Sequence, residues 1–195
     1  DNSTSWGHDV EAAKKLLDGA GWVAGSDGVR AKDGTKLELV MTIPSNAPVA
    51  TNEANLLQKQ LGEIGIKLSV STVEIDKYFP EYLNKKNYAL TAFTTENTQY
   101  PLANVGQYYA STSQSNYTGL SVPEVDQYVA KIGSTPDGAE RNKLANDLDK
   151  ILWENVFNIP IYQRMQLTAV PKTLRNFGAQ GLASFRPESI GYVKS

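Results

Sequence analysis

A strand–helix–strand pattern over residues 37–72 constrains the fold of this chain more than any other feature. Apolar and polar residues alternate over 37–43, as in a strand with one buried face, and Pro44 ends the run. Apolar positions at helical spacing then follow over 54–64, with Thr51 as a candidate N-cap, and Gly65 separates them from a second alternating run over 66–72. Because such crossovers are nearly always right-handed, we expect two parallel strands with the helix packed on one face, which is an α/β fold.

A third apolar run, over residues 88–93, leads into a polar loop. The run is nearly unbroken, which suits a strand covered on both faces in the middle of a parallel sheet, and a helix over 75–83 precedes it. Residues 94–99 then bring hydroxyl, amide and carboxylate groups to the carboxyl end of that strand. Ligands of open α/β sheets usually bind at this edge, so we predict a binding loop. A solvated connection is the alternative.

The remaining segments predict helices and short strands around this sheet. Asp9 can cap a helix that Gly21 ends, and Asp-Gly pairs at 27–28 and 33–34 indicate a small hairpin or paired turns. We also expect helices over 102–109, over 121–133 with Ser121 as its cap, and from 135 to 152, short strands over 159–162 and 167–170, and a mostly irregular tail over 171–195. A length of 195 residues suits one domain, so we expect a single α/β lobe over residues 1–195.

The composition disfavours several classes of function. With 41% hydrophobic residues, 21% charged residues and a net charge of -2, the chain has no positive field to attract nucleic acid. No apolar run approaches the roughly 18 residues of a membrane span. Residues 1–5 lack the basic and apolar parts of a signal peptide, so we expect any export signal to lie outside this chain. The absence of cysteine excludes disulfides and thiolate metal sites without fixing the compartment.

Residue patterns for catalysis are scarce. His8 is the single histidine, and no Gly-x-Ser-x-Gly elbow accompanies it. The sequence also lacks a phosphate-binding loop, a dinucleotide glycine pattern, an EF-hand loop and zinc-ligand spacing. We therefore expect no enzyme activity, no cofactor and no metal site.

Aromatic and hydrogen-bonding side chains gather instead around the polar loop. Phe93, Glu96 and Tyr100 lie in or beside it, and Tyr162 and Gln163 follow a late predicted strand. Aromatic rings give contact area at little entropic cost, and one carboxylate can hold a ligand ammonium or hydroxyl group. We predict the first three as ligand contacts and the other two as a second set. Core packing is the alternative for Phe93 and Tyr162.

A series of short motifs runs in order along nearly the whole chain. These motifs are HDVEAAKKLL at 8–17, AGW at 20–22, DGVR at 27–30, KDG at 32–34, LEL at 37–39, LGEIGI at 61–66, YAL at 88–90, NYTG at 116–119, PEVD at 123–126, AER at 139–141 and IPIY at 159–162. Each match is short, but the ordered set is specific. It resembles the second lobe of family 5 extracellular solute-binding proteins, the oligopeptide- and dipeptide-binding type that serve ABC importers.

The resemblance implies one lobe of a two-lobed, periplasmic-binding-protein-like fold, with a mainly parallel open sheet and helices on both faces. Family members are longer and enclose the ligand between two lobes joined by a hinge. This chain would then be the C-terminal lobe with half of the cleft, and the N-terminal lobe would be its missing partner. Outside the cytoplasm, in the periplasm or as a cell-surface lipoprotein, it would capture a peptide or another small solute for an ABC permease in the membrane.

The resemblance also bears on the ligand. Phe93 stands where the family often has a tryptophan, and Glu96 stands where it often has an aspartate that pairs with a peptide amino terminus. Residues 99–101 lack the Asp-Pro pair of the family, so sugars, metal chelates and other solutes stay open beside peptides.

Two other functions also stay open. A hydrolase using His8 would lose its activity on His8→Ala. A sensor or interaction module built on the same lobe cannot be separated from a transport protein by sequence.

Overall fold

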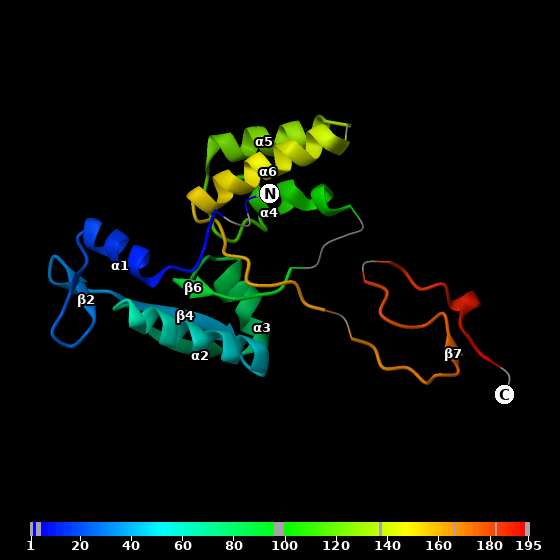
Figure 1. Ribbon diagram of the computed structural model, residues 1–195, viewed down its shortest axis with the longest axis horizontal. Coiled ribbons are helices and arrows are strands. Elements are labelled where there is room, and N and C mark those ends of the chain that lie inside the picture. The colour runs from blue at the N-terminus through cyan, green and yellow to red at the C-terminus, as the bar shows by residue number, and fades with distance from the viewer. Residues whose placement is uncertain are drawn as a thin grey trace. The chain divides into compact units, whose positions relative to one another are not determined.

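The chain packs as two compact units in a computed structural model that describes residues 2, 5–95, 100–136, 138–165, 167–181 and 183–193. The first unit consists of Asp1–Thr95 with Tyr117–Gly119, and the second consists of Glu96–Asn116 with Leu120–Ser195. Figure 1 shows that both mix helices with irregular segments. That they form a single lobe over residues 1–195 stays a prediction.

A parallel sheet forms the centre of the first unit, with the strand order β5-β4-β6. Strand β4 (Glu38–Pro44) pairs with β5 (Lys67–Val73) along its whole length, from Glu38↔Lys67 to Pro44↔Val73. Helix α2 (Pro48–Glu63) connects these two strands and runs alongside them (Figure 1). The predicted parallel strand–helix–strand unit and the α/β class are therefore confirmed.

The predicted central position of residues 88–93 is wrong. Only Leu90–Thr91 form a strand, β6, and β6 pairs with β4 alone, so it is an edge strand of this sheet. Strand β4 takes the centre, and its Met41 and Ile43 are each 1% exposed. Tyr88 and Ala92 pack against core side chains, although neither belongs to the strand. Their apolar character made the whole run look like a buried strand in the sequence.

Helix α2 packs on the sheet through two alanines, with the larger Leu57 and Leu61 beside them. Ala50 and Ala54 are buried there against Met41, Ile43 and Leu68. The helix begins with Pro48, which suits the first turn because a missing backbone donor costs nothing there. The predicted cap Thr51 is wrong, since it lies one turn inside the helix and its hydroxyl donates to the Ala47 carbonyl at 3.2 Å.

Helix α1 (Val10–Gly19) and a small antiparallel sheet precede the parallel sheet. Asp9 caps α1 as predicted, accepting the Ala12 amide at 2.8 Å. The predicted hairpin is confirmed as three short strands in the order β1-β2-β3, namely β1 (Val23–Ala24), β2 (Arg30–Lys32) and β3 (Thr35–Lys36).

Arg30 joins this hairpin to both neighbouring helices. Its side chain is buried, and its Nε donates to the Ile64 carbonyl after α2 at 2.7 Å. One terminal nitrogen, Nη1, donates to the Trp22 carbonyl at 2.6 Å and to the Asp18 carboxylate on α1 at 2.5 Å. Gly65 approaches this side chain so closely that a Cβ there would lie 2.7 Å from Arg30 Cγ.

Helices dominate the second unit. They are the 3₁₀ turn η2 (Pro101–Asn104), α4 (Val105–Tyr109), α5 (Pro123–Ser134) and α6 (Gly138–Glu154). In their core, Val125 and Ile132 from α5 pack against Leu148, Ile151 and Leu152 from α6. Ser121 was expected to cap α5, but Val122 occupies that position and no side chain caps the helix.

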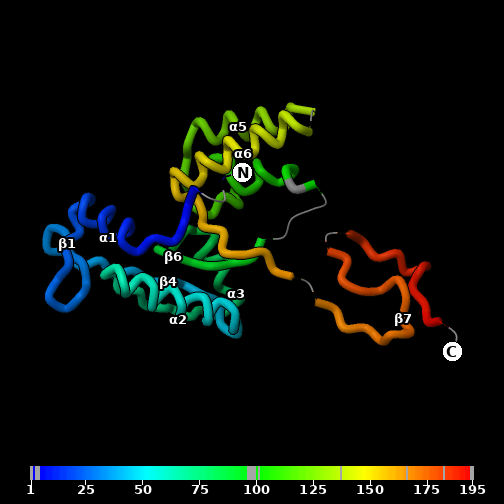
Figure 2. Tube along the Cα trace, viewed as in Figure 1, coloured from blue at the N-terminus to red at the C-terminus, as the bar shows by residue number. Residues whose placement is uncertain are grey.

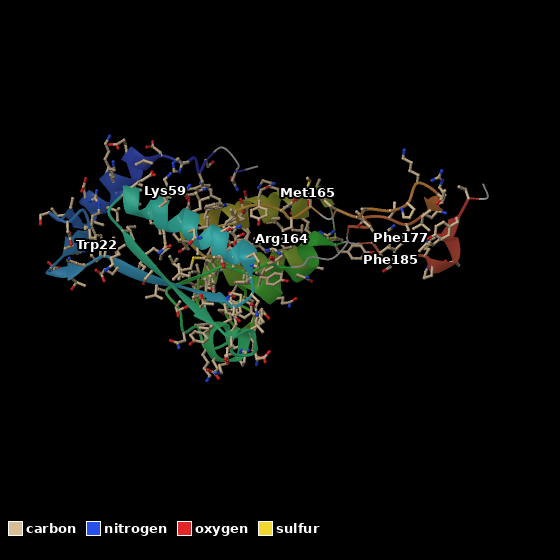
Figure 3. The ribbon with its side chains drawn as sticks, turned by 90° about the horizontal axis from the view of Figure 1, so that it is seen from below. Trp22, Lys59, Arg164, Met165, Phe177 and Phe185 are labelled. Atoms are coloured by element: carbon tan, nitrogen blue, oxygen red, sulfur yellow. The ribbon has the colours of Figure 1, made fainter. Side chains whose placement is uncertain are left out.

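The segment after α6 runs extended without joining a sheet. In the described residues of 159–170, no strand forms, so the two predicted short strands are wrong there. Figure 2 draws this segment as the gold-to-orange tube that follows α6. Met165, labelled with Arg164 in Figure 3, is 81% exposed.

The C-terminal tail is mostly irregular, as predicted. Its regular parts in the described residues are β7 (Leu174–Arg175) paired with β8 (Gly191–Tyr192), and the short 3₁₀ helix η3 (Pro187–Ser189). The rings of Phe177 and Phe185 stack with their centroids 5.2 Å apart (Figure 3).

Candidate functional site

A partly buried hydrogen-bond network holds the carboxyl end of β6. Helix α3 (Ile75–Lys77) continues directly into the π-helix η1 (Tyr78–Leu83), which buries the Tyr78 side chain to 1% exposure. The Thr91 hydroxyl donates to the Thr42 carbonyl of β4 at 2.8 Å, so it accepts from the Tyr78 hydroxyl at 2.7 Å. The Tyr78 hydroxyl also donates to the Ala92 carbonyl at 3.0 Å, so its single proton is shared between these two acceptors. Burial raises the pKa of the Tyr78 phenol, which keeps it a neutral donor.

Phe93 follows this network directly and is part of an aromatic pair. Its side chain is 41% exposed, and its ring meets the Tyr117 ring edge to face, with centroids 5.2 Å apart and planes at 89°. The Tyr88 hydroxyl donates to the Tyr117 backbone carbonyl at 2.6 Å. Thr94 and Thr95 come next and are exposed. We call Phe93 and Tyr117 the aromatic corner.

Among the predicted ligand contacts, Phe93 lies in the first unit and the three others that the structure describes lie in the second. Tyr100 is 74% exposed, Tyr162 is 56% exposed, and Gln163 is exposed. Because neither Phe93 nor Tyr162 is buried, core packing does not explain them. Glu96 lies outside the described residues, as does the rest of the predicted binding loop over 97–99. That these five residues surround one ligand stays a prediction.

Tyr117 is the residue that sequence reasoning missed. It lies far along the chain from Phe93, and the sequence between them gives no sign that residues 117–119 pack with the first unit. The NYTG motif at 116–119 was the available signal, because its glycine marks a tight turn.

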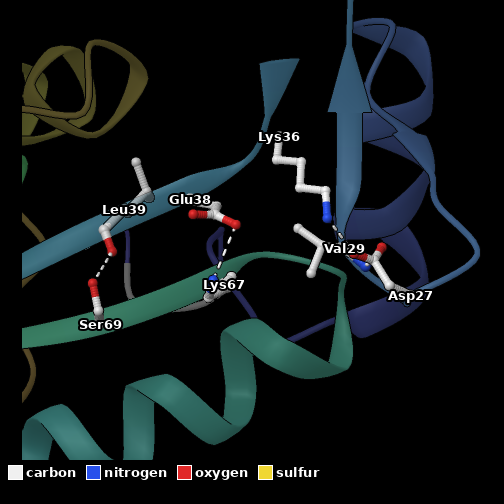
Figure 4. Close-up of polar contacts among 7 residues, drawn as sticks. All are labelled: Asp27, Val29, Lys36, Glu38, Leu39, Lys67 and Ser69. Carbon is white, nitrogen blue, oxygen red and sulfur yellow. Dashed lines mark hydrogen bonds and ion pairs between the residues drawn. The ribbon is translucent and has the colours of Figure 1, made fainter. Parts of the chain in front are cut away.

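A shallow hollow of about 330 Å³ lies at the other edge of the sheet. Its lining consists of Asp27, Gly28, Val29, Gln58, Gly62, Gly65, Ile66, Lys67 and Leu68. Glu38 and Lys67, the first residues of β4 and β5, form an ion pair there at 3.1 Å (Figure 4). This edge is therefore the amino edge, opposite the end of β6 that carries Phe93.

The charged groups at this hollow largely satisfy one another. Asp27 pairs with Lys36 and accepts the Val29 amide at 3.2 Å (Figure 4). The hydrogen bond from Lys36 lowers the pKa of the Asp27 carboxyl, and its reciprocal effect raises the pKa of Lys36. With positive and negative groups paired in this way, the hollow offers a ligand little net charge.

Other features of the described residues complete the description of possible sites. His8 is exposed in the lead before α1. Across the ranges that the structure describes, no group of histidine and acidic side chains could hold a metal ion. No helix there has both the length and the apolar character to cross a bilayer.

Comparison with known proteins places the chain in a family. The sequence profile of the bacterial extracellular solute-binding proteins, family 5, middle region, matches residues 1–119. The oligopeptide-binding protein OppA of Mycobacterium tuberculosis is 31% identical over 194 residues, which cover all of this chain and 32% of that protein. The chain thus spans about a third of the length of this curated relative.

Solved structures share the fold. An oligopeptide-binding protein of Thermotoga maritima, solved with mannohexaose, superposes with a TM-score of 0.69 at 23% identity, covering 80% of this chain and 31% of that one. The oligopeptide-binding protein AppA of Bacillus subtilis, solved with a nonapeptide, gives a TM-score of 0.66 at 20% identity, covering 77% and 30%. The fold is therefore that of the periplasmic binding proteins, and the profile match over more than half of the chain shows that it belongs to the family 5 bacterial extracellular solute-binding proteins.

Proposed function

We propose that this chain is the C-terminal, ligand-binding lobe of a substrate-binding protein of an ABC importer, which captures a peptide or another small solute outside the cytoplasm. Membership of the solute-binding family carries the proposal. The relatives are binding proteins, and the proposed role needs no catalysis and no cofactor. The partners would be the solute, an N-terminal lobe and a membrane permease.

The exposed ring of Phe93 supports the proposed position of the ligand. It follows the carboxyl end of β6, at the sheet edge where ligands of open α/β folds usually bind. The Tyr78 network holds that end of the strand to β4, so Phe93 projects from a rigid base. We propose Phe93, Glu96 and Tyr100 as ligand contacts, with Tyr162 and Gln163 as a second set.

The ligand class rests on the relatives. One is named for oligopeptides, one was solved with a nonapeptide and one with mannohexaose. Peptides and oligosaccharides both present apolar faces between hydrogen-bonding groups, which suits aromatic rings interspersed with amide and carboxylate side chains. We propose a peptide or another small solute, with oligosaccharides as the class that the mannohexaose complex adds.

The proposed mechanism is closure of two lobes over the solute. A ligand that binds the closed form better shifts the open–closed equilibrium by that difference in affinity. This chain alone would supply half of the enclosing surface. It should therefore bind the solute much more weakly than the full-length protein does.

Calorimetry with the full reading frame that contains this chain tests the proposal. The probes are a mixture of alanine-rich tetrapeptides and mannohexaose, titrated into the full-length protein and into the 195-residue chain. We expect binding of one probe class by the full-length protein and at least about 100-fold weaker binding by the chain, since most of the enclosure is lost. Equally tight binding by the isolated chain would overturn the half-cleft mechanism.

Phe79 provides a matched control for Phe93. Phe79 is 43% exposed and also meets a tyrosine edge to face, Tyr78 at 5.3 Å, but it belongs to η1 and not to the strand end. Phe93→Ala should weaken binding about 5- to 10-fold, which corresponds to the loss of one aromatic contact. Phe79→Ala should leave the affinity within about 2-fold, and equal losses in the two variants would argue against Phe93 as a contact.

A further inference from the structure

Three residues of the chain leave the second unit to complete the first. Tyr117–Gly119 pack with the first unit, whereas the residues before and after them belong to the second unit. Tyr117 joins the cluster of Tyr78, Leu83 and Tyr88, and its ring meets Phe93. This three-residue segment thus brings the Tyr117 side chain next to Phe93, just after the end of β6.

Specific contacts fix this return on both sides. The Tyr88 hydroxyl donates to the Tyr117 carbonyl at 2.6 Å. Gly119 has φ +71°, a backbone conformation that favours glycine, and the flexible Lys86 side chain lies where a Cβ would be. Before the return, the buried Asn116 side chain donates to the Leu120 carbonyl at 2.9 Å and to the Ala110 carbonyl at 3.3 Å, which closes the base of the loop.

The contact with Tyr117 determines how Phe93 can meet a ligand. An exposed phenylalanine on a strand end samples several rotamers, but an edge-to-face neighbour at 5.2 Å favours the one that keeps the contact. The two rings at 89° form a corner with apolar walls, and the hydroxyls of Thr94 and Thr95 follow it. Such a corner fits an apolar group with a flat or rounded face.

We propose that Tyr117 is a positioning and specificity-determining residue of the solute site, and that the aromatic corner takes an apolar group of the solute. This inference rests on the proposed function. The group it selects is a hydrophobic peptide side chain or the C–H face of a sugar ring, which share the same chemistry toward an aromatic wall.

The test uses the full reading frame, with three calorimetric probes: the tetrapeptides Ala-Phe-Ala-Ala and Ala-Ala-Ala-Ala, and mannohexaose. Tyr117→Leu should lower the affinity for the probe that uses the corner about 3- to 10-fold. If peptides are the ligands, the loss should fall on Ala-Phe-Ala-Ala, with Ala-Ala-Ala-Ala changing less than about 2-fold. If sugars are the ligands, it should fall on mannohexaose. Tyr117→Phe should keep the affinity, because the ring contact and the backbone carbonyl that Tyr88 binds are both retained.

Tyr82→Leu is the control, since Tyr82 packs in the same cluster as Tyr117. A purely structural role for Tyr117 predicts similar losses for all probes and similar losses in both variants, and this result would overturn the inference. A ligand-independent readout is the rotamer of Phe93, measured from the three-bond couplings between its Hα and Hβ protons and assigned with Phe93→Leu. One rotamer should dominate in the unaltered protein and in Tyr117→Phe, and the couplings should show rotamer averaging in Tyr117→Leu.

Couplings that still report one dominant Phe93 rotamer in Tyr117→Leu would refute the positioning role even where solute binds. If the unaltered protein binds none of the three probes, the proposed function fails for these solutes and the specificity role of Tyr117 fails with it. In that case the Phe93 couplings still decide whether Tyr117 positions Phe93.

Discussion

Replacing Arg30 by methionine should destabilise the first unit by about 3 to 5 kcal/mol. Arg30 is 5% exposed, and methionine keeps its apolar stem while removing every donor of the guanidinium. The carbonyls of Ile64 and Trp22 would lose partners at 2.7 and 2.6 Å. Hydrogen bonds from a charged donor contribute about 1.5 to 3 kcal/mol each, and these two bonds dominate the estimate.

The ion pair with Asp18 contributes much less. The Asp18 side chain is 62% exposed, and pairs of this kind are worth at most about 1 kcal/mol. Asp18→Asn should therefore cost under about 1 kcal/mol. Arg30→Lys should lie between the two variants, because one ammonium group cannot reach both carbonyls with the geometry of a guanidinium fork.

Urea unfolding followed by Trp22 fluorescence measures these differences in the unit that contains Arg30. A Trp6→Phe, Trp153→Phe background removes the other two tryptophans, so the signal comes from the hairpin beside Arg30. A cost of Asp18→Asn equal to that of Arg30→Met would show that the ion pair, and not the carbonyl bonds, holds the hairpin. A cost of Arg30→Met below about 1 kcal/mol would refute the reasoning altogether.

Three more predictions follow from single positions. Gly65→Ala should lower the free energy of unfolding in urea by about 2 kcal/mol, because its φ of +85° and a Cβ 2.7 Å from a neighbouring side chain are both unfavourable. Gly62→Ala in α2, which has open space around it, should raise the free energy of unfolding by about 0.5 to 1 kcal/mol. Equal effects of the two substitutions would contradict this prediction. Leu83→Ala should cost about 2 to 5 kcal/mol since Leu83 is 0% exposed, and Leu16→Ala, at 75% exposure, under about 0.5 kcal/mol; a small loss at Leu83 would place it outside the core. Burial raises the pKa of Tyr78, so its contribution to stability is present below the unfolded pKa of about 10 and is lost as pH rises through the folded pKa. From about pH 9 to 12, the free energy of unfolding should therefore fall less steeply in Tyr78→Phe than in the unaltered protein. Parallel pH profiles of the two proteins would disprove this.

Local periodicity predicted the regular elements well. The apolar spacing within α1, α2, α5 and α6 depends on residues a few positions apart, and the alternation in β4 and β5 likewise needs no distant partner. The connection between β4 and β5 leaves little choice of topology, so their parallel pairing was also predictable.

Properties that depend on distant residues were harder to predict. The position of a strand within its sheet is set by its neighbours, and the apolar composition around Leu90 did not distinguish an edge strand from a central one. The short apolar runs over 159–162 and 167–170 were predicted as strands, yet no strand forms in the described residues there. The predicted caps Thr51 and Ser121 were wrong because a proline is the first residue of each helix. Pro48 begins α2 before Thr51, and Pro123 begins α5 two residues after Ser121.

The candidate site divides in the same way. The place of Phe93 could be predicted because it is the last residue of the apolar run over 88–93, and a position just after a strand is a local property. Tyr117 could not, because its ring contact joins residues on opposite sides of a whole helical segment. Glu96 remains a prediction from sequence alone.

The split membership of residues 117–119 also affects how this polypeptide can be made. As the ribosome releases the chain from its N-terminus, the sheet-containing unit has all of its strands once Thr91 has emerged, but it still lacks Tyr117. The ring of Phe93 and the hydroxyl of Tyr88 would stay without these partners until some two dozen further residues have been translated. For the same reason, a recombinant fragment cut at Thr95 would omit part of its own packing, and a fragment extended through Gly119 is the shortest contiguous piece that contains the whole unit.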